Sequence, residues 1–315
     1  MNGILVTPRS LSKEGHPALS ALEQAGFHLV MPSPGETPGE DALMQALPGC
    51  VGWLAGVEPV SERVLAAADR LKVISRNGSG VDNLPLQALE QRAITVCRTP
   101  GSNARSVAEL ALSLTLAGLR HIVWTHEGLR AGSWSRQIGR EIKGATIGIV
   151  GLGAIGTDLA QMCLDLGAHV KAHDPFAPDD RLTHPCLQRV DLEGALTNVD
   201  AISLHAPMPA NGTPLLTLAR FAALMPHTVL VNTARAGLVD EPALLAALES
   251  DRLACYATDV FETEPPAPSP LLGHPKVILT SHIGGFTTNA VDRSTRAAVE
   301  NLMRTLECHL GCHAD

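Results

Sequence analysis

The sequence predicts an α/β protein with two domains, each built around a doubly wound parallel sheet. Its 315 residues are too many for one ordinary hydrophobic core and suit two domains. Short apolar, β-branched runs alternate with helical stretches along most of the chain, as they do in β-α-β units. Runs such as 147–150 and 229–231 contain no alternating polar residues, which is typical of strands covered by helices on both faces.

Five strands are expected in the first domain. They comprise residues 3–7, 28–31, 51–56, 72–75 and 94–97, with helical segments around 16–25, 61–70 and 85–92. A long helical stretch from 103 to about 130 follows, with apolar residues at three- and four-residue spacing. We expect this stretch to link the two domains.

Six strands are expected in the second domain. They comprise residues 146–150, 169–174, 201–206, 228–234, 255–260 and 277–282. From 287 to 310 the pattern predicts one amphipathic helix, whose packing partner is not evident from periodicity.

Composition narrows the class of protein further. Hydrophobic residues make up 45% of the chain and charged residues 18%, as in globular proteins, and no apolar run reaches the roughly 18 residues that span a membrane. The net charge of -8, without a basic cluster, argues against nucleic acid as a partner. The first residues lack a secretory signal, so we expect a cytoplasmic protein without a membrane partner.

The seven cysteines are mostly scattered among apolar neighbours, which is typical of core residues in a reducing compartment. The tail differs, because Cys308, His309, Cys312 and His313 bring soft metal ligands close together. Their spacing departs from that of haem attachment, and terminal segments commonly fray. We therefore expect an unspecialised tail and no metal site.

A glycine-rich turn opens the second domain. The pattern G-x-G-x-x-G follows strand 146–150 directly and precedes a helical segment. Glycines there let the backbone and a helix N-terminus approach a pyrophosphate, which predicts a dinucleotide site rather than a purely structural turn. The residues predicted to form it are Gly151, Gly153, Ala154, Ile155 and Gly156. Asp174 ends the next strand, where a carboxylate binds a ribose 2′-hydroxyl and repels a 2′-phosphate, so NAD is predicted over NADP.

Three polar residues lie near other predicted strand ends: Arg235, Glu264 and His282. Ligands of open α/β sheets bind beyond the carboxyl ends of the strands, so these residues can converge although they are far apart in sequence. Each has a structural alternative. Arg235 can cap a strand or helix, Glu264 can be a solvated turn residue, and His282 can be structural, as most of the thirteen histidines must be structural or exposed.

Six segments resemble, in order, signatures of the D-2-hydroxyacid dehydrogenase family. They are SRNGSGVDN (75–83), TPGSNARSVAEL (99–110), GLGAIG (151–156), NTARAGLVDE (232–241), TDVFETEP (258–265) and SHIGG (281–285). The resemblance implies a larger Rossmann NAD-binding domain, 101–286, and a smaller, discontinuous, flavodoxin-like substrate-binding domain, 1–100 with 287–315. It also implies an active site between the domains, and a homodimer formed around residues 103–140, including Trp134.

The resemblance further implies a catalytic set of Arg235, Glu264 and His282, with Thr233 and Asp259 at the cofactor. Oxidising a secondary alcohol requires a hydride acceptor and a base for the hydroxyl proton, and an imidazole that titrates near neutral pH serves in both directions. The Glu264 carboxylate is expected to orient the ring of His282 and raise its pKa. Arg235 is expected to bind the substrate carboxylate and polarise its C2 carbonyl through charge-assisted hydrogen bonds.

The same resemblance assigns the loop after strand 72–75 to the substrate. Asn77, Gly78, Ser79 and Gly80 are expected to bind its carboxylate through a nest of backbone N–H groups. Arg76 is expected to meet a second anionic group such as a phosphate, as in phosphoglycerate dehydrogenases, here in a form without a regulatory domain.

The sequence therefore predicts an oxidoreductase for a small, anionic D-2-hydroxy or 2-keto acid. The expected substrates are 3-phosphoglycerate and phosphohydroxypyruvate first, then hydroxypyruvate or glyoxylate. Formate or phosphite dehydrogenase is a further alternative. A non-catalytic, NAD-sensing regulator of the same fold is another, and the retained Arg, Glu and His argue against it.

Overall fold

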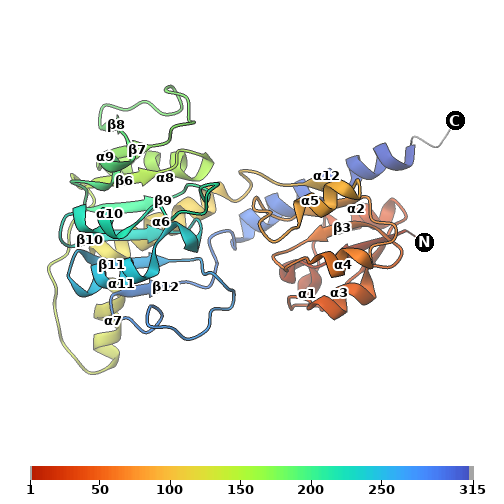
Figure 1. The fold of residues 1–315 in the computed structure, drawn as a ribbon, viewed down its shortest axis with the longest axis horizontal. Helices are drawn as coiled ribbons and strands as arrows, with labels where there is room; N and C mark the ends of the chain where they lie inside the picture. The colour runs from red at the N-terminus through yellow and green to blue at the C-terminus, as the bar shows by residue number, and fades with distance from the viewer. Residues whose placement is uncertain (1, 312–315) are drawn as a thin grey trace. The chain divides into compact units, whose positions relative to one another are not determined.

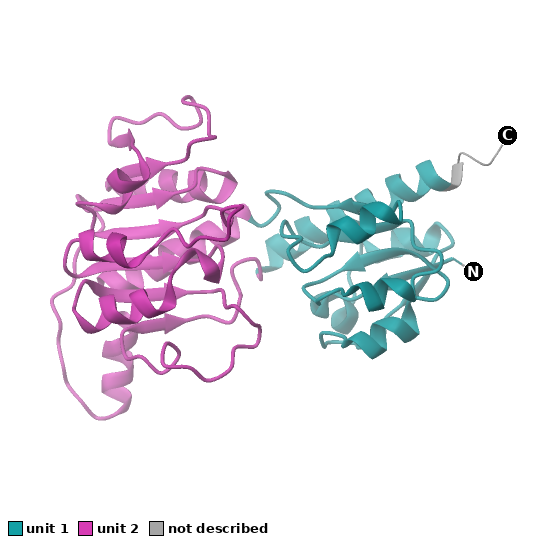
Figure 2. Ribbon diagram, viewed as in Figure 1, with its two compact units in different colours: residues 1–103, 287–315 teal, residues 104–286 magenta. Residues whose placement is uncertain are grey.

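The computed structural model describes residues 2–311 of the chain, so Cys312 and His313 of the tail lie outside the described residues. The chain divides into two compact units, Met1–Asn103 with Thr287–Asp315 (unit 1) and Ala104–Phe286 (unit 2), as Figure 2 shows. The first division lies three residues after the predicted boundary at 100, and the second is the predicted one at 286.

Unit 1 contains a parallel five-stranded sheet of order β2-β1-β3-β4-β5. Its strands are β1 (Gly3–Val6), β2 (His28–Val30), β3 (Cys50–Ala55), β4 (Val73–Arg76) and β5 (Thr95–Cys97). One face packs against α1 (Arg9–Glu14), α2 (Leu19–Gln24) and α12 (Thr288–Gly311), and the other against α3 (Glu40–Ala46), α4 (Glu62–Ala66) and α5 (Leu86–Gln91). Because both faces are covered, the central strand β3 is buried along its whole length.

Unit 2 contains a parallel seven-stranded sheet of order β12-β11-β10-β9-β6-β7-β8 (Figure 1). Its strands are β6 (Thr146–Val150), β7 (His169–His173), β8 (Leu187–Arg189), β9 (Ala201–Leu204), β10 (Thr228–Asn232), β11 (Leu253–Thr258) and β12 (Val277–Leu279). Helices α6 (Ala104–Leu119) and α8 (Ala154–Asp165) cover one face, and α9 (Leu192–Leu196), α10 (Leu218–Ala223) and α11 (Glu241–Glu249) cover the other. The predicted α/β class, with two doubly wound parallel sheets, is confirmed.

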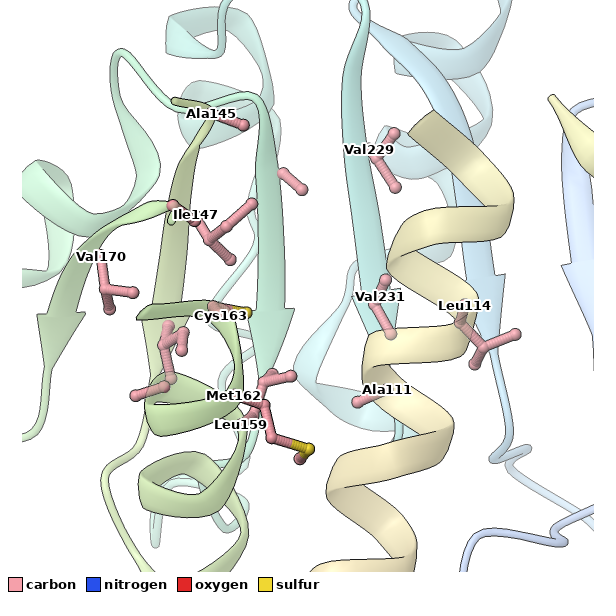
Figure 3. Close-up of a cluster of buried hydrophobic side chains, with 14 of the residues drawn as sticks. Ala111, Leu114, Ala145, Ile147, Leu159, Met162, Cys163, Val170, Val229 and Val231 are labelled. Atoms are coloured by element: carbon pink, nitrogen blue, oxygen red, sulfur yellow. The ribbon is translucent and has the colours of Figure 1, made fainter. Parts of the chain in front are cut away.

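The face under α6 and α8 is a close-packed apolar core. Figure 3 shows Val229 and Val231 of β10 beside Ala111 and Leu114 of α6. Gly118, one turn further along α6, lets that helix approach β10 closely, because a Cβ atom there would lie 2.8 Å from Val229 Cγ1. This packing fixes the backbone from which the strand-end residues of unit 2 project.

The helical stretch expected from 103 to about 130 is present but divided. The structure has two helices, α6 and α7 (Ile122–Arg130), bent by 63°. His121 lies between them in the left-handed region, with φ of 54°, which ends the first helix. Helix α7 contains no buried residue, so the core beneath α6 does not extend under it. Among the described residues no single helix is long and apolar enough to cross a membrane. Of these residues, only α6 and α7 taken together have the length and composition of a membrane span.

Each predicted strand is present, although β12 ends three residues earlier than expected. The short strand β8 and the helices α1, α3, α9, α10 and α11 were not predicted. Each has nine residues or fewer, too few for a periodic pattern to distinguish it from a loop.

Candidate active site

The register of the sheet in unit 2 aligns six strand ends in one row. In order along the row, the paired residues are His173, Val150, Leu204, Asn232, Thr258 and Leu279. The residues that follow them therefore lie along one edge of the sheet, and they are Asp174, Gly151, His205, Thr233, Asp259 and Thr280. This edge is where a doubly wound sheet binds ligands.

The glycine turn after β6 leaves a helix N-terminus open to an anion. Gly151 has φ of 100°, and a Cβ atom on it would lie 2.7 Å from the carbonyl oxygen of His205. At Gly156 a Cβ atom would lie 1.8 Å from the carbonyl oxygen of Gly151, so a side chain there is excluded. Gly153 caps α8 without a side-chain hydrogen bond and faces open space, which leaves backbone N–H groups available to a pyrophosphate.

Asp174 anchors the turn and presents a negative charge beside it. Its Oδ2 accepts from the Leu152 N–H at 2.7 Å, and Oδ1 accepts from Phe176 and Ala177 at 2.9 and 3.1 Å. Burial alone would raise the pKa of Asp174, but these N–H donors and nearby Arg189 hold it below its usual range. The carboxylate is therefore ionised at neutral pH and retains lone pairs for ribose hydroxyls.

Two buried polar atoms at this edge have no hydrogen-bond partner among the described residues. They are Thr233 Oγ1, after β10, and His205 Nδ1, after β9. The other ring nitrogen of His205, Nε2, is bonded to Ser203 Oγ at 2.8 Å, and burial lowers the pKa of His205 to about 4, so the ring stays neutral. Unsatisfied buried atoms beside an open glycine turn fit a polar ligand such as a dinucleotide.

His282, Glu264 and Arg235 come together at the β10 to β12 end of the edge. His282 Nδ1 donates to Glu264 Oε2 at 2.6 Å, and their side chains are 48% and 34% exposed. Within residues 2–311 the Nε2 atom has no hydrogen-bond partner, so it can face a substrate. The Arg235 guanidinium is close enough to act on the charge of both groups.

The electrostatics of this cluster favour a charged pair. The hydrogen bond to Glu264 raises the pKa of His282, against the opposing effects of burial and Arg235. Burial alone would raise the pKa of Glu264, but its bond from His282 and the nearby cations lower it. An imidazolium paired with a carboxylate is therefore the stable form near neutral pH.

Asp259 supports the loop that carries His282. It is 2% exposed, and its Oδ1 accepts from Thr280 Oγ1 at 2.6 Å and from the Ile283 N–H at 2.8 Å. Its Oδ2 accepts from the Gly284 N–H at 2.8 Å. These bonds hold the loop that carries His282, whose φ is 54°. A place for Asp259 at the cofactor stays a prediction.

Asn232 is a site residue that sequence reasoning missed. It is fully buried at the end of β10, and its Nδ2 donates to the Arg235 carbonyl at 2.8 Å. Its Oδ1 accepts from the Ala234 N–H at 3.1 Å. These bonds close the turn that presents Thr233 and Arg235. The only signal in the sequence was a polar residue at the end of an otherwise apolar strand.

The predicted substrate loop lies in unit 1, after β4. Asn77 Nδ2 donates to Thr295 Oγ1 at 3.5 Å, and Ser79 Oγ donates to the Thr99 carbonyl at 3.3 Å. Arg76, expected in the loop after strand 72–75, is instead the last residue of β4 and is 8% exposed. The short predicted strand 72–75 gave no sign that it continues to Arg76.

Residues 112–284 match the family model for the NAD-binding domain of D-isomer specific 2-hydroxyacid dehydrogenases. The chain belongs to this family. It is 37% identical over 272 residues to D-3-phosphoglycerate dehydrogenase of Mycobacterium bovis, covering 85% of this chain and 52% of that relative. It is 35% identical over 273 residues to hydroxypyruvate reductase of Thermotoga maritima, covering 85% of this chain and 88% of that relative.

Solved structures agree with the family. The TT0316 protein from Thermus thermophilus superposes with a TM-score of 0.86 at 33% identity, and 97% of each chain is covered. The chain spans about half the length of the mycobacterial relative. NAD is the cofactor of the matched domain, and the open glycine turn, Asp174 and the unsatisfied Thr233 hydroxyl fit it.

Asp174 is expected to set the preference for NAD over NADP. Its ionised carboxylate repels a 2′-phosphate, so the ratio of kcat/KM for NADH to that for NADPH should fall about tenfold in Asp174→Asn. The amide oxygen can still accept from the Phe176 and Ala177 N–H groups, whereas the bond from the Leu152 N–H is lost. Asp179→Asn, an exposed change in the same loop, is the matched control. An unchanged ratio in Asp174→Asn contradicts this role.

Proposed function

We propose that the protein is an oxidoreductase that transfers a hydride between NAD and C2 of a small D-2-hydroxy or 2-keto acid. The observation that carries this proposal is the hydrogen-bonded pair of His282 and Glu264, with Arg235 beside it, on the same sheet edge as the glycine turn. An acid-base group, a fixed cation and a dinucleotide turn are the parts that this redox reaction requires.

Each residue of the cluster has a distinct part in the proposed reaction. Bound NAD supplies the hydride donor or acceptor. In the direction of reduction, His282 Nε2 gives its proton to the C2 oxygen, and in the direction of oxidation it takes the hydroxyl proton. Glu264 keeps the ring oriented and stabilises the imidazolium. Arg235 binds the carboxylate and the C2 oxygen through its planar N–H groups.

Steady-state oxidation of NADH tests the activity. The substrates are glyoxylate, hydroxypyruvate, pyruvate and phosphohydroxypyruvate, and at least one should be reduced. If NADH binds but none of these acids is reduced, the activity is contradicted and a non-catalytic, NAD-sensing regulator is favoured.

Glu264→Gln should move the pH profile of keto-acid reduction. Because the pKa of His282 is raised, the proton donor persists above its usual pKa of about 6.5, and kcat/KM falls only as pH rises through the raised value. Without the carboxylate, the descending limb should shift to lower pH and activity at pH 8 should fall about tenfold or more. Glu262→Gln is the nearby control. If the descending limb of kcat/KM lies at the same pH in Glu264→Gln and Glu262→Gln, this role for Glu264 is excluded.

We also propose a homodimer formed through α7 and the segment that follows it. Four apolar side chains there are exposed to solvent: Ile122 (54%), Leu129 (52%), Trp134 (82%) and Ile138 (98%). Such a concentration of exposed apolar side chains is typical of an interface. Light scattering should give a dimer for the native protein and a monomer for Trp134→Ser with Ile138→Ser. The control Leu218→Ser, at another exposed apolar site, should remain a dimer.

A cytoplasmic location is part of the proposal. All six cysteines among the described residues are free, and burial raises the pKa of the Cys163 and Cys255 thiols to about 12, which keeps them unreactive. Free, protonated core thiols suit a reducing compartment.

A further inference from the structure

Unit 1 buries an acidic side chain in the segment that follows β3. Glu58 is 1% exposed, whereas its neighbour Val57 is 50% exposed and Pro59 is also exposed. A carboxyl group is therefore turned inward between two apolar residues that face solvent, which is the reverse of the usual distribution. Its burial costs free energy unless hydrogen bonds replace those that water would make.

The Glu58 carboxyl joins this segment to the end of β1. Its Oε1 accepts from the Gly56 N–H at 2.9 Å and from the Thr7 hydroxyl. The Trp53 indole donates to the same hydroxyl at 3.0 Å, so the Thr7 side chain is held in place as well. A Cβ atom on Gly56 would lie 2.6 Å from Glu58 Oε2, so the carboxyl packs directly against that glycine. These contacts fix the path of residues 56–60 as they leave β3.

The contacts of Glu58 depend on an acceptor oxygen rather than on a charge. Burial raises the pKa of its carboxyl, and the hydrogen bonds and the charge of Arg76 oppose that rise without cancelling it. The neutral acid therefore persists to a higher pH than in an exposed glutamate. In the neutral acid Oε1 remains the acceptor for Gly56 and Thr7, and the amide oxygen of a glutamine can replace it.

The segment that Glu58 fixes is bonded to both sides of the predicted substrate loop. At the start of the loop, the Asn77 N–H donates to the Ala55 carbonyl at 2.9 Å. Shortly after its end, Asn83 Nδ2 donates to the Glu58 carbonyl at 2.6 Å, and the Val60 N–H donates to the Asn83 carbonyl at 3.0 Å. A displacement of this segment therefore displaces the loop.

The loop has a polar atom available for a ligand. It lies at the carboxyl end of β4, in the parallel sheet of unit 1, which is the edge where such sheets bind ligands. Asn77 Oδ1 is buried and has no hydrogen-bond partner among residues 2–311. A buried polar atom without a partner fits a polar ligand, and its usefulness depends on where the backbone of the loop holds it.

We propose that Glu58 is a positioning residue for the substrate: its carboxyl fixes the segment after β3, and that segment holds the loop that carries Asn77. This inference rests on the proposed dehydrogenase activity. Glu58 touches neither reacting atoms nor cofactor in this account, so its removal should weaken binding of the keto acid and leave the chemical step and the cofactor site in unit 2 intact.

The test compares kcat, KM for the keto acid that the native protein reduces best, and the affinity for NADH in four proteins. They are the native protein, Glu58→Ala, Glu58→Gln and Glu62→Ala. In Glu58→Ala the KM should rise about tenfold, while kcat stays within about threefold and the affinity for NADH stays native. Glu58→Gln keeps the acceptor oxygen, so its KM should lie within about threefold of native. Glu62→Ala removes an exposed acid at the start of α4 and should behave as the native protein.

The outcomes separate this inference from the proposed function. If the native protein reduces no keto acid, the dehydrogenase proposal has failed and the role of Glu58 fails with it. If keto acids are reduced but KM is native in Glu58→Ala, or is raised equally in Glu58→Gln, only the role of Glu58 is overturned. A parallel loss of kcat and NADH affinity in Glu58→Ala indicates general damage and also overturns it.

A second variant decides the matter if Glu58→Ala does not fold. Asn83→Ala removes the side-chain bond to the Glu58 carbonyl and leaves the buried contacts of the carboxyl in place. Its KM for the keto acid should rise about threefold to tenfold with a native affinity for NADH. A native KM in Asn83→Ala overturns the proposed link between this segment and the loop.

Discussion

His282→Asn is expected to lower kcat for keto-acid reduction by about 10² to 10⁴ while leaving the affinity for NADH nearly unchanged. Asparagine tolerates the left-handed backbone that His282 adopts, with φ of 54°, so the loop is retained while the proton donor is lost. The effect is large because Nε2 is the titrating atom of the cluster without a protein partner among the described residues. Steady-state rates and a fluorescence titration of NADH give the two quantities.

His169→Asn is the matched control for that experiment, because His169 is exposed at the opposite, amino end of β7. Its kcat should equal that of the native protein. Equal loss of NADH affinity and kcat in His282→Asn points to damage at the cofactor site, and a kcat within twofold of native excludes His282 as the proton donor.

Arg235→Gln is expected to raise KM for the keto acid and lower kcat, with kcat/KM reduced by about 10² to 10³. The guanidinium acts on both His282 and Glu264, and its planar N–H groups match a carboxylate and the adjacent carbonyl oxygen. Arg235→Lys keeps the charge without this geometry, so it should recover only part of the loss.

Exposed Arg181 provides the control, since Arg181→Gln removes a cation of unit 2 that is not part of the proposed catalytic cluster. Full recovery in Arg235→Lys indicates that charge alone suffices. A KM for the keto acid that stays native in Arg235→Gln removes the guanidinium from substrate binding.

Much of the fold was predictable because buried parallel strands leave a strong local signal. The continuous apolar runs at β3, β6 and β10 correspond to strands buried along most of their length. The glycine pattern was informative because its spacing is set by steric contacts within a few residues, such as that between Gly156 and the Gly151 carbonyl. The residues along the sheet edge were predicted from the rule that open parallel sheets bind ligands beyond the carboxyl ends of their strands.

The remaining features depend on partners distant in sequence, which periodicity does not report. Burial of Arg76 follows from its place at the end of β4, where its Nη1 lies against the Ala55 carbonyl of β3. The internal role of Asp259 depends on its bonds to residues 280–284. The break at His121 depends on where the core beneath α6 ends, and the apolar pattern continues past that point.

Transfer of deuterium from NADH labelled at both C4 positions of the nicotinamide tests the central claim most directly. The protein is incubated with labelled NADH and hydroxypyruvate, or with the keto acid that it reduces best, and the product is analysed by proton NMR. A single deuterium at C2 of a D-configured 2-hydroxy acid, formed at a much lower rate by His282→Asn, is the predicted result. A product without deuterium at C2, or NADH that remains unoxidised with every keto acid, contradicts the account.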